Sequence, residues 1–267
     1  MTGAVLSAWV EGVGLLGPGM TSWTDAVHVL AGEVDWVSVP TVLPPPQSLP
    51  AAERRRTGPS VKLTLATGLE ATRHAGIDAA LLPAVFTSSG GDGQNCHEIC
   101  EALASAERQI SPTRFHNSVH NAAAGYWGIA TGATPASTAL CAHDASFGAG
   151  LLETLTQVVA EHTAVLLLAY DSAYPEPING ARAIPDAFGV ALVLAPERGA
   201  ATLARIEAHL SDAAADEMSP PLENLRRRIP AARSLPLLAR LAGATAGPVV
   251  LEYLPHLRLA LKVTPCR

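Results

Sequence analysis

Three residues with acid–base or nucleophilic side chains, Cys141, His143 and Asp144, lie together in the middle of the chain. They stand between an apolar run, residues 136–142, and a segment with the apolar period of a helix that begins near Ser146. Such a turn suits acyl transfer, because free backbone N–H groups and the helix dipole stabilise an anion there. Asp144 and Ser146 are also suitable N-caps for this helix. The residue that occupies the turn therefore decides the chemistry.

Cys141 and His143 each have a structural interpretation beside the catalytic one. Cys141 would be a small residue of the core on the same strand face as His143, two positions later. His143 would be a polar residue held neutral by the helix N-terminus, where the dipole disfavours an imidazolium. For both residues we favour the structural interpretation.

A second group of potential ligands, Cys96, His97 and Cys100, lies in a predicted helix over residues 95–107. A Cys-x3-Cys spacing next to a histidine is compatible with zinc. A structural zinc site needs a further pair of ligands, which His116 and His120 could supply only if the fold brought them close. We therefore expect buried helix cysteines and no metal.

The elements that must position these residues alternate between strand and helix. Residues 121–131 form a predicted helix of small residues that ends at Gly132, followed by a turn over residues 133–135 and a buried strand over residues 136–142. The unbroken apolar run 164–169 is typical of a strand in the middle of a sheet that is covered on both faces. Further strands are expected over residues 5–16, 84–88 and 188–195, and further helices over residues 24–30 and 61–75. This alternation predicts an α/β fold.

Composition limits the classes of partner. The chain of 267 residues is 48% apolar and only 16% charged, so it can bury a large core. Its net charge of −6 gives no electrostatic basis for binding nucleic acid or an acidic membrane surface, and its apolar runs are too short to span a bilayer. The four cysteines form no paired framework and no basic signal segment begins the chain, so we expect the reducing cytoplasm.

Two other patterns are interpreted structurally. The glycines of GVGLLGPG, residues 12–19, predict a tight left-handed turn after the first strand, and no nucleotide cofactor is expected because no G-x-G-x-x-G leads into the next helix. The run Glu53 to Arg56 predicts a solvated helix start, with docking of an acidic carrier protein as the functional alternative.

Residues 201–267 differ in character from the rest. They predict a strand over residues 202–209, two helices within residues 220–239 that Pro230 separates, and a pair of strands over residues 249–254 and 257–263. Arg226, Arg227 and Arg228 are expected on a polar helix face. We treat this part as a C-terminal extension that packs on a domain over residues 1–200.

Several segments in order resemble the N-terminal half of the β-ketoacyl synthases of the thiolase superfamily. FHNSVHNAAAGYWGIATG, residues 115–132, is similar to the family's F-x-x-S-x-x-N-x-x-A-G-x-x-x-I-x-x-G helix. WVEGVGLLGPGMTSWTDAVHVLAGE, RRRTGPSVKLTLATGLEATRHAGID and DAFGVALVLAPE resemble the opening, the second helix and the strand that closes the first sheet. The resemblance covers roughly residues 4–200 and implies a thiolase-like half with a βαβαβαββ-type sheet covered by helices.

The resemblance also shows what this chain lacks. Counting from Pro135, or back from Ser146, puts the family's catalytic cysteine position at His143, whereas the next strand puts it at Asp144 or Ala145. The His-Gly-Thr-Gly-Thr and Asn-x-x-x-Gly-Gly-x-Asn settings of the two family histidines are absent from the sequence. Condensation needs a thiolate and two imidazoles, so the chain is not expected to catalyse it alone.

A family member without its nucleophile resembles a chain length factor, in the short form found with aryl polyene ketosynthases. This resemblance implies a heterodimer with an active ketosynthase, which receives acyl carrier protein through the complex, and no cofactor or metal. It also implies residues at the interface or the tunnel end, namely Phe115, Val119, Asn121, Ala122, Tyr126 and Trp127. Ordinary core packing is the alternative for Tyr126 and Trp127. Two other functions stay open, namely a stand-alone acyltransferase or hydrolase that uses Cys141 or His143, and a homodimeric scaffold.

Overall fold

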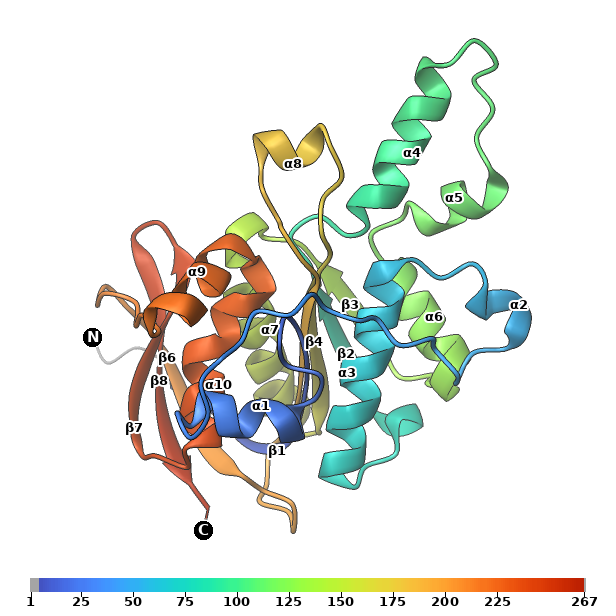
Figure 1. The fold of residues 1–267 in the computed structure, drawn as a ribbon. Helices are drawn as coiled ribbons and strands as arrows, with labels where there is room; N and C mark the ends of the chain where they lie inside the picture. Colours follow the sequence, from blue (N-terminus) through green and yellow to red (C-terminus); the bar gives the residue numbers. More distant parts are fainter. Residues whose placement is uncertain (1–4, 267) are drawn as a thin grey trace.

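One mixed sheet of eight strands organises the chain, and helices cover both of its faces (Figure 1). The computed structural model describes residues 5–266. The strands are β1 (Leu6–Leu16), β2 (Ala84–Thr87), β3 (Ser137–Leu140), β4 (Val165–Asp171), β5 (Phe188–Ala195), β6 (Ala204–Ser211), β7 (Gly247–Leu254) and β8 (Leu257–Pro265). The longer helices are α1 (Trp23–Leu30), α3 (Pro59–Ala75), α4 (Gly93–Ala104), α6 (Ala122–Thr131), α7 (Ser146–Glu161), α9 (Pro220–Arg228) and α10 (Leu235–Ala242). The short ones are α2 (Ala51–Arg54), α5 (Pro112–Asn117), α8 (Ile178–Ala181) and the 3-10 turns η1 (Ala79–Leu81), η2 (His143–Ala145) and η3 (Pro230–Ser234).

The strands follow the order β3-β2-β4-β5-β1-β6-β8-β7. β2 pairs in parallel with both β3 and β4, and every other neighbouring pair is antiparallel. The expected α/β fold is therefore confirmed. β3 and β7 are the edges of the sheet, and β3 leads directly into the turn that holds Cys141 and His143.

The two faces of the sheet carry separate cores, as the period of two along a strand requires. In β4, Val165 and Leu167 contribute to the core beneath α7, η3 and α10, whereas Leu166 and Leu168 contribute to the core beneath α3 and α6. Every residue of β4 is buried. This strand therefore lies in the middle of the sheet, as its unbroken apolar run predicted.

The glycines of β1 serve close packing and not a turn. A Cβ built on Gly14 would lie 1.9 Å from the carbonyl oxygen of Thr67, and one on Gly12 would lie 2.1 Å from that of Ala71. Both oxygens belong to the backbone of α3, so α3 can approach β1 only where β1 has no side chain. The predicted left-handed turn is wrong for Gly12 and Gly14, and applies only to Gly19, whose φ is +67°.

The central segment differs in detail from its prediction. The helix over residues 121–131 is confirmed as α6, with Gly132 in the left-handed conformation at its end. The following strand is wrong in extent and in burial, because β3 covers four residues only and has no fully buried residue. As an edge strand it has a neighbour on one side only, which explains its exposure.

The C-terminal part extends the same sheet. β6 pairs with β1, β8 pairs with β6, and β7 closes this side of the sheet. The predicted helices and strands of this part are confirmed, but Arg226 is wrongly placed on a polar face, because it is 3% exposed and paired with carboxylates. The boundary at residue 200 stays a prediction. Within residues 5–266, no helix is long and apolar enough to cross a membrane.

Candidate functional site

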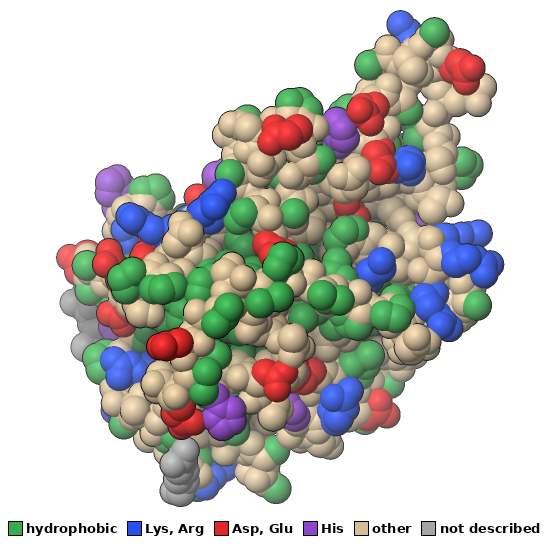
Figure 2. Space-filling model, viewed as in Figure 1, with side chains coloured by type: hydrophobic (Ala, Val, Ile, Leu, Met, Phe, Trp, Pro, Cys, Tyr) green, Lys and Arg blue, Asp and Glu red, His purple; other side chains and the backbone are tan. Residues whose placement is uncertain are grey.

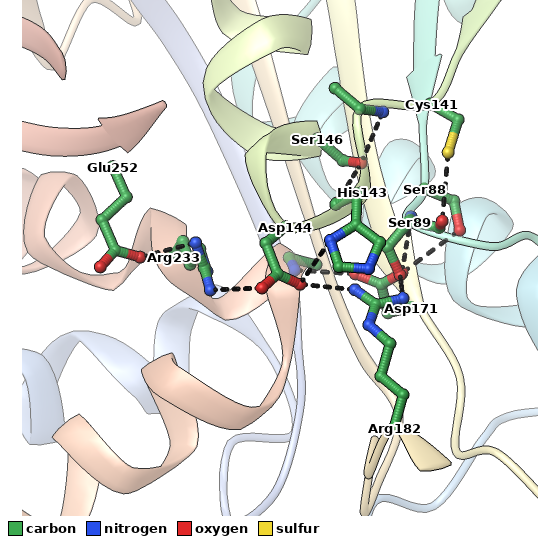
Figure 3. Close-up of polar contacts among 12 residues, drawn as sticks. Ser88, Ser89, Cys141, His143, Asp144, Ser146, Asp171, Arg182, Arg233 and Glu252 are labelled. Atoms are coloured by element: carbon green, nitrogen blue, oxygen red, sulfur yellow. Dashed lines mark hydrogen bonds and ion pairs between the residues drawn. The ribbon is translucent and has the colours of Figure 1, made fainter. Parts of the chain in front are cut away.

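The candidate site is the elbow between β3 and α7, formed by residues 141–146 (Figure 3). The Ser146 hydroxyl accepts a hydrogen bond from the Ala142 N–H at 3.1 Å and donates one to the carbonyl of His143 at 2.7 Å. These bonds close the turn and hold His143 at a φ of +52°, a conformation uncommon for residues other than glycine. The expected capping by Asp144 or Ser146 is wrong, because the N-cap of α7 is Ala145, without a side-chain bond.

Cys141 lies at the start of the elbow, directly after the end of β3, and not in the core. Its side chain is exposed, and its thiol donates a hydrogen bond to the carbonyl of Ser89 at 3.1 Å. Since β3 ends at Leu140, Cys141 and His143 do not share a strand face, and both parts of that expectation are wrong. Among residues 5–266, the Ser89 carbonyl is the hydrogen-bond partner of this thiol, so no histidine or carboxylate stands ready to take its proton.

The His143 side chain points out of the elbow. It is 69% exposed, and its Nδ1 lies 3.5 Å from Oδ1 of Asp144, which is too long for a strong hydrogen bond. The expectation that His143 is a polar residue satisfied at the helix N-terminus is therefore wrong, because the imidazole is mostly in solvent. An imidazole in this position has no thiol beside it to activate.

Asp144 carries the strongest electrostatic contacts of the elbow. Its Oδ1 accepts a hydrogen bond from Nη2 of Arg182 at 2.5 Å, and its Oδ2 accepts one from Nη2 of Arg233 at 3.1 Å. Burial alone would raise the pKa of this carboxyl, but the hydrogen bond from Arg182 and the charges of Arg233, Arg182 and His143 outweigh it and lower the pKa. Asp144 is therefore a fixed anion between two cations and not a general base.

The ion pairs continue from the elbow into the C-terminal part. Nη1 of Arg233 lies 2.8 Å from Glu252, and Nη1 of Arg226 lies 3.4 Å from the same carboxylate. Arg226 also donates two hydrogen bonds of 2.7 Å to Glu223. We call this set the elbow charge chain; its members are Arg182, Asp144, Arg233, Glu252, Arg226 and Glu223. It links the loop after β4, the elbow, η3, β7 and α9.

Beneath the elbow, Asp171 is a fully buried carboxyl at the end of β4. Its Oδ1 accepts hydrogen bonds from the Ser88 hydroxyl and from both the N–H and the hydroxyl of Ser89, and its Oδ2 accepts one from the N–H of Ala231. Burial raises its pKa, and the hydrogen bonds only partly offset this. Asp171 therefore fastens the ends of β2 and β4 to η3.

An open cavity of about 390 Å³ adjoins the elbow. Its lining includes the histidine His143, the carboxylates Asp144 and Glu252, the arginines Arg233 and Arg258, and the phenol of Tyr253. Of these, Asp144, Arg233 and Glu252 are paired with one another. Cys141 does not belong to the lining, so the cavity brings no thiol together with an imidazole. The geometry therefore suits a self-paired structural site better than acyl transfer.

The ion pairs of Asp144 predict a pH dependence of stability. A carboxyl whose pKa is lowered in the folded state stabilises the fold above its ordinary value of 3.8, and the effect disappears as the pH falls through the folded pKa. We expect Asp144→Asn to melt at a lower temperature than wild type at pH 7, with the difference vanishing well below pH 3.8. Thermal unfolding followed by circular dichroism at both pH values measures this. Asp212→Asn, at an exposed aspartate, is the control, and an equal difference at both pH values would show that the ion pairs do not stabilise the fold.

The residues assigned to the interface or tunnel fall into two groups. Phe115 and Val119 are 68% and 52% exposed, Asn121 is exposed, and Ala122 is half-buried. Tyr126 and Trp127 are buried in their own chain, where Tyr126 donates a hydrogen bond to Asn117 and Trp127 packs on Gly68. Only the first group can present side chains to a partner in this conformation.

The potential metal ligands are not brought together. Cys96 and Cys100 are exposed on α4, so the expectation of buried helix cysteines is wrong. Within the described part of the chain, no group of three or more His, Cys, Asp or Glu side chains could hold a metal ion.

Sequence reasoning missed Asp171, Arg182 and Arg233. Asp171 had a signal, because a polar residue at the carboxyl end of a buried strand is a common place for a functional side chain. Arg182 and Arg233 had none, since they lie 38 and 89 residues from Asp144 in loop and 3-10 segments.

Comparison with known proteins agrees with this architecture. The family model of the β-ketoacyl synthase N-terminal domain matches residues 32–245. No protein with a curated description matches the sequence. Among solved structures, the ketosynthase in complex with its chain length factor from Xenorhabdus doucetiae is similar, with 23% identity, a TM-score of 0.73, and coverage of 96% of this chain and 99% of that one.

Two further solved structures share the fold. The ishigamide ketosynthase/chain length factor has 14% identity and a TM-score of 0.69, over 98% of this chain and 100% of that one. A type II polyketide synthase acyl carrier protein in complex with its ketosynthase bound to the hexaketide includes a chain with 11% identity and a TM-score of 0.76, over the same shares of the two chains. The family match spans well over half of the sequence and the fold agrees with it. This chain belongs to the β-ketoacyl synthase N-terminal-domain family.

Proposed function

We propose that this chain is a non-catalytic, chain-length-factor-like subunit that pairs with an active β-ketoacyl synthase and shapes its acyl tunnel. The observation that carries the proposal is the elbow, where the carboxylate of Asp144 is held between two arginines. The resemblance puts the family's nucleophile position at His143, or at Asp144 or Ala145, and none of these residues is a cysteine. A thiolate activated by a base is what acyl transfer requires, and the elbow does not supply one. Two of the similar structures are described as ketosynthases with a chain length factor, which agrees with such a role.

The open edge of the sheet supports pairing with another subunit. β3 pairs only with β2, so one row of its backbone N–H and C=O groups is available to a partner strand. Beside it, α5, α6 and their connection expose Phe115, Val119 and Ile129, and a Cβ built on Gly125 would meet nothing within 4 Å. Apolar side chains beside an unpaired strand favour a protein interface on this side of the molecule.

Phe115 and Val119 are the candidates for a tunnel end. They are large or branched, exposed, and close in sequence to the small residues of α6. If such side chains face the partner's acyl chain, their bulk limits its length, because packed pockets resist overfilling. Tyr126 and Trp127 would then act indirectly, because they are buried residues of α6 and fix its position on α3.

Carrier protein would reach the partner's site through the complex. A positively charged area lies near α2, where Arg54, Arg55 and Arg56 follow one another (Figure 2). Arg55 and Arg56 are exposed and line a cavity of about 320 Å³ together with Arg114. In a chain of net charge −6, a local excess of arginine favours contact with an acidic protein.

Co-expression with the candidate ketosynthase tests the proposal. We expect a one-to-one complex on size exclusion that elongates malonyl carrier substrates only when the partner's cysteine is intact. Cys141→Ala and His143→Ala in this chain should leave elongation within about twofold of wild type, because neither side chain contacts an activating group. Phe115→Ala should shift the product-length distribution, and Val42→Ala, at an exposed valine outside β3, α5 and α6, is its control.

The alternative is a stand-alone acyltransferase or hydrolase that uses Cys141 or His143. The exposed thiol of Cys141 is the feature that keeps this alternative function open. A free monomer or homodimer with its own acyl-transfer activity, lost in Cys141→Ala, would refute the subunit proposal and establish the enzyme. A homodimer with no activity and no ketosynthase partner would point to a scaffold.

A further inference from the structure

Two cysteines on α4 form a pair that the proposed function does not use. Cys96 and Cys100 lie one helical turn apart, and residues four positions apart on a helix are neighbours on its surface. Both residues are exposed, and Gly93 and Asn95 are the only buried residues of α4. α4 stands out from the body of the molecule, with its end away from the sheet (Figure 1). Both thiols are therefore accessible on one face of a projecting helix.

The two side chains are neighbours on the surface of α4. Residues four positions apart on a helix have Cβ atoms about 5–6 Å apart, so both sulfur atoms can reach one ion. Partial removal from water raises the pKa of the Cys96 thiol, and the neighbouring Cys100 raises it further. Cys141 and Cys266 offer the contrast of single thiols, since their hydrogen bonds are to the carbonyls of Ser89 and Thr264.

The pair does not suit zinc. Structural zinc takes four ligands, and no third histidine, cysteine or carboxylate joins the pair to form a metal site among residues 5–266. His97, the nearest candidate in sequence, has its Nε2 turned to Glu101 at 3.2 Å. Thiolate sulfur prefers soft metal ions. Among these, a monovalent d10 ion such as Cu(I) can be bound by two sulfur ligands without any further ligand.

We propose that Cys96 and Cys100 form a two-thiolate site for a soft monovalent d10 metal ion, of which Cu(I) is the physiological example. Binding forms two metal–sulfur bonds and releases one proton from each thiol, with no change in oxidation state. Metal ions bind the thiolate form of cysteine, so each thiol must lose its proton on binding and affinity rises with pH. Release of two protons makes the association constant rise about 100-fold per pH unit while both thiols are protonated.

Competition with a Cu(I) chelator tests the site. The full-length chain is reduced with ascorbate without oxygen and titrated with Cu(I) against bathocuproine disulfonate, whose absorbance reports the copper that the protein does not hold. We expect one Cu(I) per chain, and an affinity at least about 100-fold lower in Cys96→Ser and in Cys100→Ser, since each loses one of two ligands. Cys141→Ser and Cys266→Ser are the matched controls and should bind as wild type does.

A second readout guards against misfolded variants. In the wild-type chain, Cu(I) should protect Cys96 and Cys100, but not Cys141, from maleimide labelling as followed by peptide mass. Equal copper affinity in all four serine variants would overturn the proposal. So would labelling of Cys96 and Cys100 that copper leaves unchanged, or retention of tight binding in either single variant of the pair.

Discussion

A chain that carries Gly14→Ala should not reach the native fold, whereas one that carries Gly125→Ala should be more stable than wild type. The methyl group at position 14 would lie 1.9 Å from the carbonyl oxygen of Thr67, and this atom belongs to the backbone of a 17-residue helix. Relief requires α3 to move off β1 and to lose contacts along its whole buried face. Overpacking with no flexible neighbour places the cost above about 3 kcal/mol.

Gly125 offers the matched control because the chemical change is the same. It lies within α6, and a Cβ there meets nothing within 4 Å. Alanine in a helix interior is favoured over glycine by about 1 kcal/mol. Chemical denaturation of both purified variants measures the contrast, and a stable Gly14→Ala protein would show that the contact of α3 with β1 is looser than the structure has it.

The same control variant informs the subunit proposal. Gly125 is exposed on the side of the molecule assigned to the partner. If a ketosynthase subunit packs on α6 there, Gly125→Ala should stabilise the isolated chain while weakening the heterodimer. Equal stability gains in the free and the bound chain would place the interface elsewhere.

Asp171→Asn should lower the melting temperature by roughly 2–10 °C. The two carboxylate oxygens accept backbone N–H groups from Ser89 and Ala231 separately, at 2.8 Å each. An asparagine has one oxygen and one NH2 group, so in either orientation a buried N–H faces another donor. An unsatisfied buried donor costs about 1–3 kcal/mol.

Ser172→Ala is the control for Asp171→Asn. Ser172 follows directly in the chain and is equally buried, but within residues 5–266 its hydroxyl has no hydrogen-bond partner. Removing that hydroxyl should leave stability unchanged or increase it. Calorimetry of the two variants compares them, and equal losses would mean that any change in this buried segment is harmful, whatever its hydrogen bonds.

The features of the fold that depend on local residue patterns could be predicted from the sequence. The apolar run that became β4 was assigned to the middle of the sheet because side chains on both of its faces had to be buried, and the alternation of strands and helices gave the α/β architecture. The helix of small residues over 121–131 is likewise confirmed as α6, whose Trp127 packs closely on Gly68. Such features depend on neighbours along the chain or on side-chain size.

The elbow could not be predicted in the same way. From the sequence alone, Asp144 is an ordinary N-cap candidate at the start of a helix. Only the folded chain brings Arg182 and Arg233 close to its carboxylate. Once both arginines are there, the carboxylate gains more from them than from backbone N–H groups. Cys141 was placed in the core because an apolar run was assumed to continue, although an edge strand can stop early.

The elbow charge chain also limits how this protein can be recombined with its relatives. Glu223, Arg226, Arg233 and Glu252 all come from the last quarter of the sequence, whereas Asp144 and Arg182 come from the middle. A hybrid that takes only its C-terminal quarter from a relative without Arg233 would leave Asp144 short of one cation. Tail and elbow should therefore be exchanged together, and the charges of the two parts are expected to change in step from one homologue to the next.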